Sequence, residues 1–388
     1  MIDHGSPPSY DPSVQQLEFL KPVEVGESPA FLREQLITYI GNKRSLLPFI
    51  GEAVRKVQRA LGVDKLRILD LFSGTGIVAR YLKQFSDSLL VNDLETYSRV
   101  TNECYLSNFS AVDYQRLADA LEWIHGEVDR NWVEGFICDL YAPKNEACIT
   151  SADRVFYTRR NAAYLDTARQ AIAALPADMQ KYFIAPLIAK ASVHANTSGV
   201  FKGFYKNKSG VGQFGGNGKD ALTRILGEIK LTLPIFSRFE CEVEVHQKDA
   251  NFLTKALTEI DLAYFDPPYN QHPYGSNYFM LNLLADYRRP TETSRVSGIP
   301  TSWNRSKYNQ RAEAADALFD AVASCPSRFI LISYNSEGFI PQEQFISHLR
   351  RYGHLDVCAT PYNTFRGSRN LRDRSIHVTE FLYLLNKH

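Results

Sequence analysis

The sequence predicts an α/β fold: a twisted, mainly parallel sheet flanked by helices, with a mainly helical insertion after the second strand. Apolar runs without alternation end abruptly in turn residues at 66–71 and 260–265, which is typical of buried parallel strands. The first run is followed by a glycine turn and a helical pattern, as at the start of a Rossmann-like unit. Between residues 97 and 233 helical patterns replace this rhythm.

The individual elements follow from the same patterns. Strands are predicted at 66–71, 88–91, 241–246, 260–265, 328–333 and 376–385. Helices are predicted at 45–61, 97–109, 114–125, 152–175, 178–197 and 342–351. A chain of 388 residues is long enough for two domains, or for one large domain with such an insertion.

Composition and charge limit the functional classes. No apolar stretch approaches the roughly 18 to 20 residues that span a bilayer, so we expect no membrane partner. The polar N-terminus lacks the apolar core of a secretory signal and is expected to be a flexible leader. Six cysteines without a Cys-x-x-Cys pair favour a reducing, cytoplasmic setting and argue against a zinc site. No other metal constellation is predicted.

The net charge of +1 hides a local segregation of charge. Basic residues gather at 199–219, 288–311 and 366–374, whereas residues 95–139 are mostly acidic. One basic face that contacts phosphates would explain this pattern, and a solvated surface is the alternative. The segment 199–218 also interleaves lysines, aromatic residues and glycines, a combination that suits a nucleic acid backbone and its bases.

A glycine turn follows the first predicted strand. Gly74 and Gly76 allow the backbone to approach a ligand closely. Asp93 lies at the tip of the second predicted strand, about 20 residues further on, where an acid can accept hydrogen bonds from a ribose. An adenosine-containing cofactor is therefore expected. Gly74-x-Gly76-x-x-Ala79 also fits the dinucleotide fingerprint, so an NAD-dependent oxidoreductase stays open.

The run at 260–265 ends in Asp266-Pro267-Pro268-Tyr269. Asp266 would lie at the carboxyl end of its strand, where open α/β sheets bind ligands. The two prolines stop the strand and leave free carbonyl acceptors, and Tyr269 offers a flat ring. These features suit an amino group on a planar heterocycle, although a plain loop after a core strand is an alternative.

Two further segments suggest ligand contacts. Gly41-Asn42-Lys43-Arg44 precedes the first predicted helix, for which Ser45 is a candidate cap, and could bind a small anion such as a carboxylate. Asp249 follows the third predicted strand. It could accept from an adenine amine or simply cap the next helix.

In order, these motifs resemble the alpha group of amino-methyltransferases, the adenine-specific DNA methylases of the Dam and FokI type. The resemblance rests on Tyr39-Ile40-Gly41-Asn42-Lys43, Asp70-Leu71-Phe72-Ser73-Gly74-Thr75-Gly76, Asn92-Asp93 and Asp266-Pro267-Pro268-Tyr269. Residues 154–161 also look like an element of the FokI-type members. The similarity extends from about residue 36 to the C-terminus, with little else between Asp93 and Asp249.

The resemblance implies a Rossmann-like S-adenosylmethionine-dependent methyltransferase fold with an inserted target-recognition domain. The expected division is a leader at 1–30, a catalytic domain at 31–96 and 234–388, and a DNA-binding insertion at 97–233. The implied reaction is methyl transfer to the N6 of adenine in double-stranded DNA. A cognate restriction endonuclease acting on the same site is a possible partner.

The resemblance also implies roles for residues. Catalysis is expected from Asp266, Pro267, Pro268 and Tyr269, with Asp266 and the Pro267 carbonyl accepting the target N–H groups and Tyr269 stacking on the flipped base. Lys43 would meet the cofactor's carboxylate. The expected cofactor-binding residues are Tyr39, Asn42, Lys43, Asp70, Phe72, Ser73, Gly74, Thr75, Gly76, Asp93, Asp249 and Asp266. The expected DNA contacts are Lys202, Lys206, Lys208, Tyr274, Asn277, Tyr278, Arg305, Arg366 and Arg369.

Other interpretations remain at this point. Cytosine N4 is also an exocyclic amine, but that group more often has Ser in place of Asp266. An NAD-dependent oxidoreductase gives no role to Asp266-Pro-Pro-Tyr269, and a catalytically silent DNA-binding protein has no need of it. RNA is a less favoured substrate.

Overall fold

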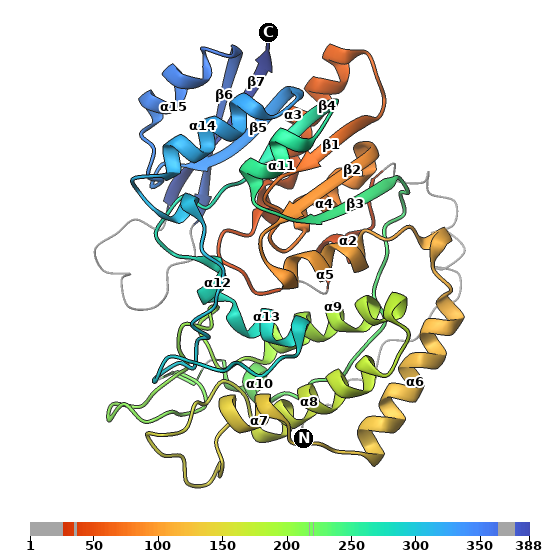
Figure 1. Cartoon of the computed structure of the whole chain (residues 1–388), viewed down its shortest axis with the longest axis vertical. Coiled ribbons are helices and arrows are strands. Elements are labelled where there is room, and N and C mark those ends of the chain that lie inside the picture. Colours follow the sequence, from red (N-terminus) through yellow and green to blue (C-terminus); the bar gives the residue numbers. More distant parts are fainter. Residues whose placement is uncertain (1–25, 35–36, 217, 220, 364–376) are drawn as a thin grey trace, which may run out of the picture.

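The computed structural model describes residues 26–34, 37–216, 218–219, 221–363 and 377–388. They form a sheet with helices on both faces and, beside it, a layer made mainly of helices (Figure 1). The sheet has seven strands in the order β3-β2-β1-β4-β5-β7-β6. Their bounds are β1 Leu66–Asp70, β2 Ser86–Asp93, β3 Glu242–Gln247, β4 Ile260–Phe265, β5 Ser327–Asn335, β6 Gly353–Asn363 and β7 His377–Lys387.

The first five strands are parallel, and β7 runs antiparallel to both β5 and β6. β1 lies between β2 and β4, with Asp70 opposite Val91 on one side and Tyr264 on the other. The carboxyl ends of these three strands therefore meet at one edge of the sheet. Asp93 and Asp266, which end or follow β2 and β4, are brought to the same place as Asp70.

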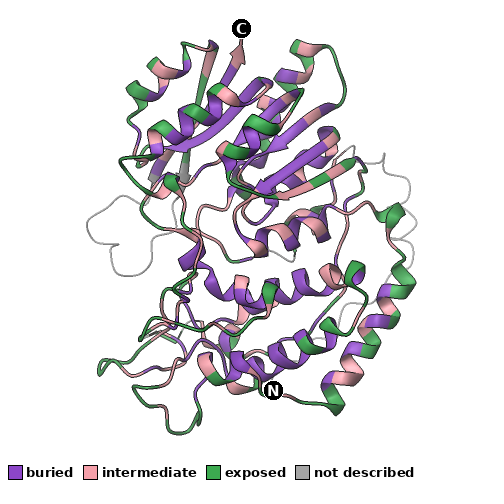
Figure 2. Cartoon of the chain, in the orientation of Figure 1, coloured by how far each residue is buried: buried purple, intermediate pink, exposed green. Residues whose placement is uncertain are grey.

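Helices cover both faces of the sheet. On one face lie α11 (Ala250–Ala256), α14 (Ala314–Ser324) and α15 (Gln342–Leu349), and on the other α3 (Leu47–Leu61) and α4 (Ile77–Leu82). The strands between them are largely buried (Figure 2). In α3, Ile50, Val54 and Val57 recur at helical spacing and are fully buried, worth about 1.5–3 kcal/mol each. Gly62, with φ +70°, ends the helix in a left-handed cap.

A separate core lies in the helical layer. It is built by α6 (Tyr114–Arg130), α7 (Phe136–Tyr141), α8 (Arg159–Ala173), α9 (Ala177–His194) and α13 (Phe279–Asp286), with the short α10 (Leu222–Leu226) beside them. Helix α5 (Thr96–Tyr105) lies between the layers and contacts both α9 and β3 (Figure 1). α13 belongs to this core although it follows Asp266 in the sequence. The short helices α2 (Pro29–Arg33) and α12 (Tyr274–Asn277) complete the set.

The predicted fold class is confirmed, and all six predicted strands are present in the described residues. The prediction missed β6 and the helices α2, α7, α10 and α14. The helix expected at 152–175 begins only at Arg159, because Thr158 Oγ1 caps it by accepting from the backbone N–H of Asn161 at 3.1 Å. The expectation that Ser45 caps the first helix was also wrong. The chain enters it through a 3₁₀ turn, Lys43–Leu46, which is capped by Asn42.

The predicted domain boundaries at residues 97 and 233 stay a prediction. The larger part of the expected leader, 1–25, lies outside the described residues.

Candidate active site

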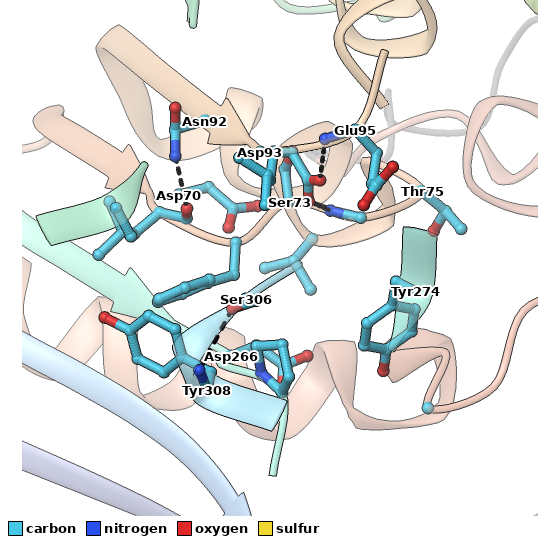
Figure 3. A pocket seen from close by; sticks show the side chains of 18 of the residues that line it. Asp70, Ser73, Thr75, Asn92, Asp93, Glu95, Asp266, Tyr274, Ser306 and Tyr308 are labelled. Carbon is cyan, nitrogen blue, oxygen red and sulfur yellow. Dashed lines mark hydrogen bonds between the residues drawn. The ribbon is translucent and has the colours of Figure 1, made fainter. Parts of the chain in front are cut away.

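The carboxyl ends of β1, β2 and β4 open into one cleft (Figure 3). Thirteen of the predicted site residues line it: Tyr39, Asn42, Lys43, Asp70, Phe72, Ser73, Gly74, Thr75, Asp93, Asp249, Asp266, Pro268 and Tyr274. Motifs from distant parts of the sequence thus share one cavity.

The glycine turn after β1 forms the floor of the cleft. Gly74 and Gly76 have φ of +54° and +76°, in the left-handed region that favours glycine. A Cβ on Gly74 would lie 3.3 Å from the ring of Tyr39, and one on Gly76 only 2.4 Å from Oδ1 of Asn102. The turn therefore needs glycine at both positions for its conformation and for close packing. Gly76 itself is not among the lining residues.

Asp70 is fully buried at the end of β1 and points into the cleft (Figure 3). Neither carboxylate oxygen has a hydrogen bond of ordinary geometry to any described residue. Burial, followed by the nearby charges of Asp266 and Asp93, raises its pKa well above the usual range, and the backbone N–H groups of Phe72 and Ala79 offset this only in part. An unpartnered buried carboxylate beside open space calls for a ligand with a cationic or hydrogen-bond-donating group.

Asp93 ends β2 and stabilises the glycine turn. Its Oδ2 accepts from the backbone N–H of Gly74 at 2.8 Å, and its Oδ1 from that of Glu95 at 2.9 Å. Burial raises its pKa, and these hydrogen bonds act against that rise. Next to it, the Asn92 amide joins Leu71 to Lys248 and so fixes three strand ends together.

Asp249 combines the two roles that the sequence left open. Its Oδ1 accepts from the backbone N–H of Phe252 at 3.0 Å and caps α11, and the residue also lines the cleft. The cap is therefore observed. A contact of the same side chain with a ligand stays a prediction.

Asp266 follows β4 and faces the cleft with 19% of its side chain exposed. Lys43 Nζ lies 3.2 Å from its Oδ1 and 2.9 Å from Oε1 of Glu380, a buried residue of β7. Burial raises the pKa of Asp266 to about 6, while Lys43 lowers it and Glu380 raises it. The pKa of Lys43 lies well above its usual range: burial lowers it, but Asp266 and Glu380 together outweigh burial. An ionised Asp266 at neutral pH follows.

The rest of the motif lies behind Asp266. Pro268 lines the cleft, whereas Pro267 and Tyr269 are buried and do not. Tyr269 packs edge-on against Tyr334, with ring centroids 6.1 Å apart, and Lys43 Nζ lies 5.8 Å from its ring centroid. Its carbonyl accepts from the backbone N–H of Phe339 at 3.0 Å, so the backbone of the motif is firmly held.

Stacked tyrosines form the wall between the cleft and the helical layer. Tyr39 stacks on Tyr278 and Tyr274, with centroids 4.3 and 5.0 Å apart, and its hydroxyl meets that of Tyr97 at 2.8 Å. Tyr278 is fully buried and accepts from the backbone N–H of Ile40 at 2.7 Å. Asn277 is buried too, and its carbonyl accepts from the backbone N–H of Phe201. Of the three residues predicted here as DNA contacts, only Tyr274 faces the cleft.

Several lining residues were not predicted from the sequence: Glu95, Asn304, Ser306, Tyr308 and Asn309. Glu95 is buried and accepts from Asn282 Nδ2 at 2.5 Å and Asn304 Nδ2 at 3.1 Å. Burial raises its pKa to about 7, against these hydrogen bonds. An acid two residues after Asp93 was a signal that could have identified it. The others lie in a loop without regular pattern.

The predicted basic contacts lie outside the cleft. Lys202, Lys206 and Lys208 are exposed on a loop that a bridge between Lys206 and Gly212 folds back on itself. Arg305 is also exposed, with its guanidinium 4.4 Å from the ring centroid of Trp303. Ser297 Oγ donates to the carbonyl of Lys202 at 2.6 Å and so ties the two basic segments together. Arg366 and Arg369 lie outside the described residues.

Within the described part of the chain, no helix is long and apolar enough to cross a membrane. No group of three or more His, Cys, Asp or Glu side chains is placed to hold a metal ion there.

Comparison with known proteins identifies relatives of this site. The family described as "D12 class N6 adenine-specific DNA methyltransferase" matches residues 39–344, which include every motif that lines the cleft up to β5. The type II methyltransferase M.NlaIII of Neisseria lactamica is 28% identical over 360 residues, 90% of this chain and 99% of that protein. M.CviAII of Paramecium bursaria Chlorella virus 1 is 27% identical over 337 residues, 85% of this chain and 93% of that protein.

M.FokI of Planomicrobium okeanokoites is 26% identical over 364 residues, and this chain spans 52% of its length. The family description names adenine N6 as the target, in agreement with the motif order, rather than cytosine N4 or a nicotinamide cofactor. With the family match covering most of the sequence, the chain belongs to the D12 class of N6 adenine-specific DNA methyltransferases.

Proposed function

We propose that this protein transfers a methyl group from S-adenosylmethionine to the exocyclic N6 of adenine in double-stranded DNA, with Asp266 as the group that aligns the target amine. The strongest support is that a single cleft contains two different carboxylates. Asp266 is ionised and paired with Lys43, whereas the oxygens of Asp70 have no hydrogen bond of ordinary geometry to a described residue. One carboxylate suits a neutral amine, and the other suits a cation.

The residues of the cleft fit the cofactor. When bound, S-adenosylmethionine supplies a methyl group already activated by its sulfonium. Asp70 would hold a cationic group of the cofactor, because its buried oxygens have no hydrogen bond of ordinary geometry to a described residue. Asp93 would accept from the ribose hydroxyls and Asp249 from the adenine amine. The other predicted cofactor contacts that line the cleft would shape its walls.

Asp266 would act by orientation and electrostatics. The lone pair of an exocyclic adenine nitrogen is delocalised into the ring, which makes the nitrogen a poor nucleophile. An ionised Asp266 accepting one N–H, and the Pro267 carbonyl accepting the other, would draw this nitrogen toward tetrahedral geometry. The base must first leave the duplex, at a cost of a few kcal/mol, and we propose that Tyr269, which does not line the cleft in the free protein, stacks on it.

For Lys43 the geometry supports a role different from the expected contact with the cofactor's carboxylate. Its ammonium already has two carboxylate partners in the chain, Asp266 and Glu380. We therefore propose that Lys43 acts on the charge of Asp266 and not on the cofactor's carboxylate.

The experiment that tests the function is modification-sensitive sequencing of DNA from a methylation-free host that expresses the protein or its Asp266→Ala variant. We expect N6-methyladenine at one short motif with the wild type and none with the variant. Soluble wild-type protein that modifies no adenine would refute the proposal. The same data would identify the recognition sequence.

The exposed Lys202, Lys206, Lys208 and Arg305 would contact DNA phosphates, with Tyr274 at the entrance to the cleft. Each lost phosphate contact lowers the slope of log affinity against log salt by about 0.9. Replacing the three lysines with glutamine should reduce that slope and weaken binding at every sequence alike. An unchanged slope would remove this loop from the interface.

We further propose that the protein acts on chromosomal DNA in a prokaryotic cytoplasm, as the modification part of a restriction–modification system with a cognate endonuclease. A lysate of the native host should then cut unmodified DNA at the recognition motif and spare DNA that this protein has modified. Equal cutting of both substrates would exclude such a partner.

A further inference from the structure

Behind Asp266, residues from opposite ends of the chain form a buried charged cluster. Lys43 comes from the first 3₁₀ turn and Glu380 from β7, and their side chains are 3% and 0% exposed. Lys43 Nζ bridges Oε1 of Glu380 at 2.9 Å and Oδ1 of Asp266 at 3.2 Å. Glu380 thus contacts Asp266 only through the lysine.

Glu380 is itself held in place by the sheet. Ser333 of β5, fully buried, donates its hydroxyl to Oε1 of Glu380 at 2.6 Å. Oε1 therefore accepts hydrogen bonds from both the Ser333 hydroxyl and the Lys43 ammonium, whereas Oε2 has no hydrogen-bond partner among the described residues. Burying a carboxylate is unfavourable, and well-packed apolar residues usually stabilise a core at least as well as a buried ion pair. Stability alone gives little reason for Glu380.

The charges of the cluster suggest another reason. Two carboxylates share one ammonium, so Lys43 cannot neutralise Asp266 completely. Lys43 lowers the pKa of Asp266, and Glu380 raises it. A shared lysine leaves Asp266 ionised near neutral pH but still a strong hydrogen-bond acceptor, which is what a neutral amine needs.

We propose that Glu380 is a positioning residue of the methyl transfer, holding the Lys43 ammonium against Oδ1 of Asp266 so that Oδ2 is left for the target amine. Ser333 orients Glu380 for this task. The inference rests on the proposed function and extends it to a residue that never meets the substrate.

Other groups near Asp266 do not confuse a pH test. Asp70 on β1, Tyr264 on β4 and Tyr274 on α12 also interact with the Asp266 charge. Burial raises the pKa of each of them well above its usual value. All three groups are the same in every variant of the test, so a shift of the acidic limb between variants reports on Lys43 and Glu380.

The test is the single-turnover rate of methyl transfer to a duplex bearing the recognition motif, measured against pH. Glu380→Gln keeps the shape and an acceptor oxygen but removes the charge. We expect the acidic limb of the profile to move to lower pH and the rate on the plateau to fall on the order of 10-fold. Lys43→Met should move the acidic limb the opposite way, to higher pH.

Ser333→Ala provides a second variant that alters no charge. We expect it to slow the plateau rate severalfold and leave the acidic limb in place. If Glu380→Gln does not fold, this variant and Lys43→Met still decide the proposal, because an unchanged rate in the first and an unmoved limb in the second would each overturn it.

Asp356→Asn is a matched control. Asp356 lies on the adjacent β6 and also pairs with a lysine, but this pair is at the surface: Lys56 Nζ lies 2.6 Å from Asp356 Oδ2. It should change neither rate nor limb. For every variant, calorimetry gives the cofactor affinity and thermal unfolding gives the stability. A rate loss in Glu380→Gln that follows lost affinity and stability, with the limb unmoved, would show a merely structural residue and overturn the proposal. A wild-type protein that transfers no methyl group would instead refute the proposed function, and this inference with it.

Discussion

Asp70 and Asp266 end or follow neighbouring parallel strands, yet they lie in opposite electrostatic situations. Asp70 is fully buried, neither of its oxygens has a hydrogen bond of ordinary geometry to a described residue, and its pKa is raised well above the usual range. Asp266 has Lys43 beside it, and its pKa rises only to about 6. The same side chain at the same edge of the sheet is thus prepared for two kinds of ligand. The difference lies in one lysine from a distant turn.

The largest expected effect that separates the two acids is on the chemical step. Asp266→Asn should reduce the single-turnover rate about 10²–10³-fold, because it removes the charge that aligns the target amine. Its effect on cofactor affinity should be smaller than that of Asp70→Asn. Rapid-quench kinetics with a labelled methyl group would measure the rate. A variant with full rate and lost cofactor affinity would reverse the assignment of the two residues.

Asp70→Asn should mainly weaken cofactor binding. Losing a charge-assisted hydrogen bond of about 1.5–3 kcal/mol raises the dissociation constant roughly 10- to 100-fold. Isothermal titration calorimetry with S-adenosylmethionine would measure it. Asp87→Asn, an exposed position at the opposite end of the sheet, is the control and should bind normally. Equal affinity in the Asp70 variant would mean that the cofactor does not use this carboxylate.

The same Asp70 substitution should stabilise the ligand-free protein. A carboxyl group whose pKa is raised by folding stabilises the native state below its unfolded pKa, near 3.9, and loses that contribution as pH rises through the folded value. Asparagine has no proton to lose, so the Asp70→Asn variant avoids this loss of stability. Thermal unfolding near neutral pH should show a free energy of unfolding about 1–3 kcal/mol higher than in the wild type, with a flatter pH dependence. A destabilised variant would show that Asp70 has a partner in the free protein.

The surroundings of Glu95 are intermediate between those of Asp70 and Asp266, and its replacement should have the smallest effect of these predictions. Its partners are the neutral amides of Asn282 and Asn304, and its pKa is raised to about 7. Glu95 stabilises the folded protein below about pH 4.3, the pKa of glutamate in the unfolded chain. This contribution disappears as the pH rises through 7. Glu95→Gln should therefore flatten the stability profile in that window by on the order of 1 kcal/mol, because glutamine has no proton to lose. Melting temperatures on either side of neutrality would test this, and an unchanged slope would contradict it.

Local patterns predicted the strand-tip acids Asp93 and Asp266, because each ends or directly follows an apolar run and parallel strands bring such ends together. Asp70 lay inside a predicted strand and was expected in the site only from the resemblance to the methylase family. Partners far apart in sequence escaped the same reasoning. Glu380 meets Lys43 across 337 positions, and its only signal was a single acid in an apolar strand. Tyr278 was expected to contact DNA, but it is buried and accepts from the backbone N–H of Ile40.

The path of the chain after Asp266 has a consequence for engineering. From α12 it enters the core of the helical layer as α13, where Phe279 packs against Tyr141, Phe156 and Phe201. Exchanging residues 97–233 with those of a relative would leave α13 facing a foreign core. A chimera built to change the target sequence must therefore carry α13 with the transplanted segment, and its second junction belongs in the chain beyond Asp286 rather than at residue 233.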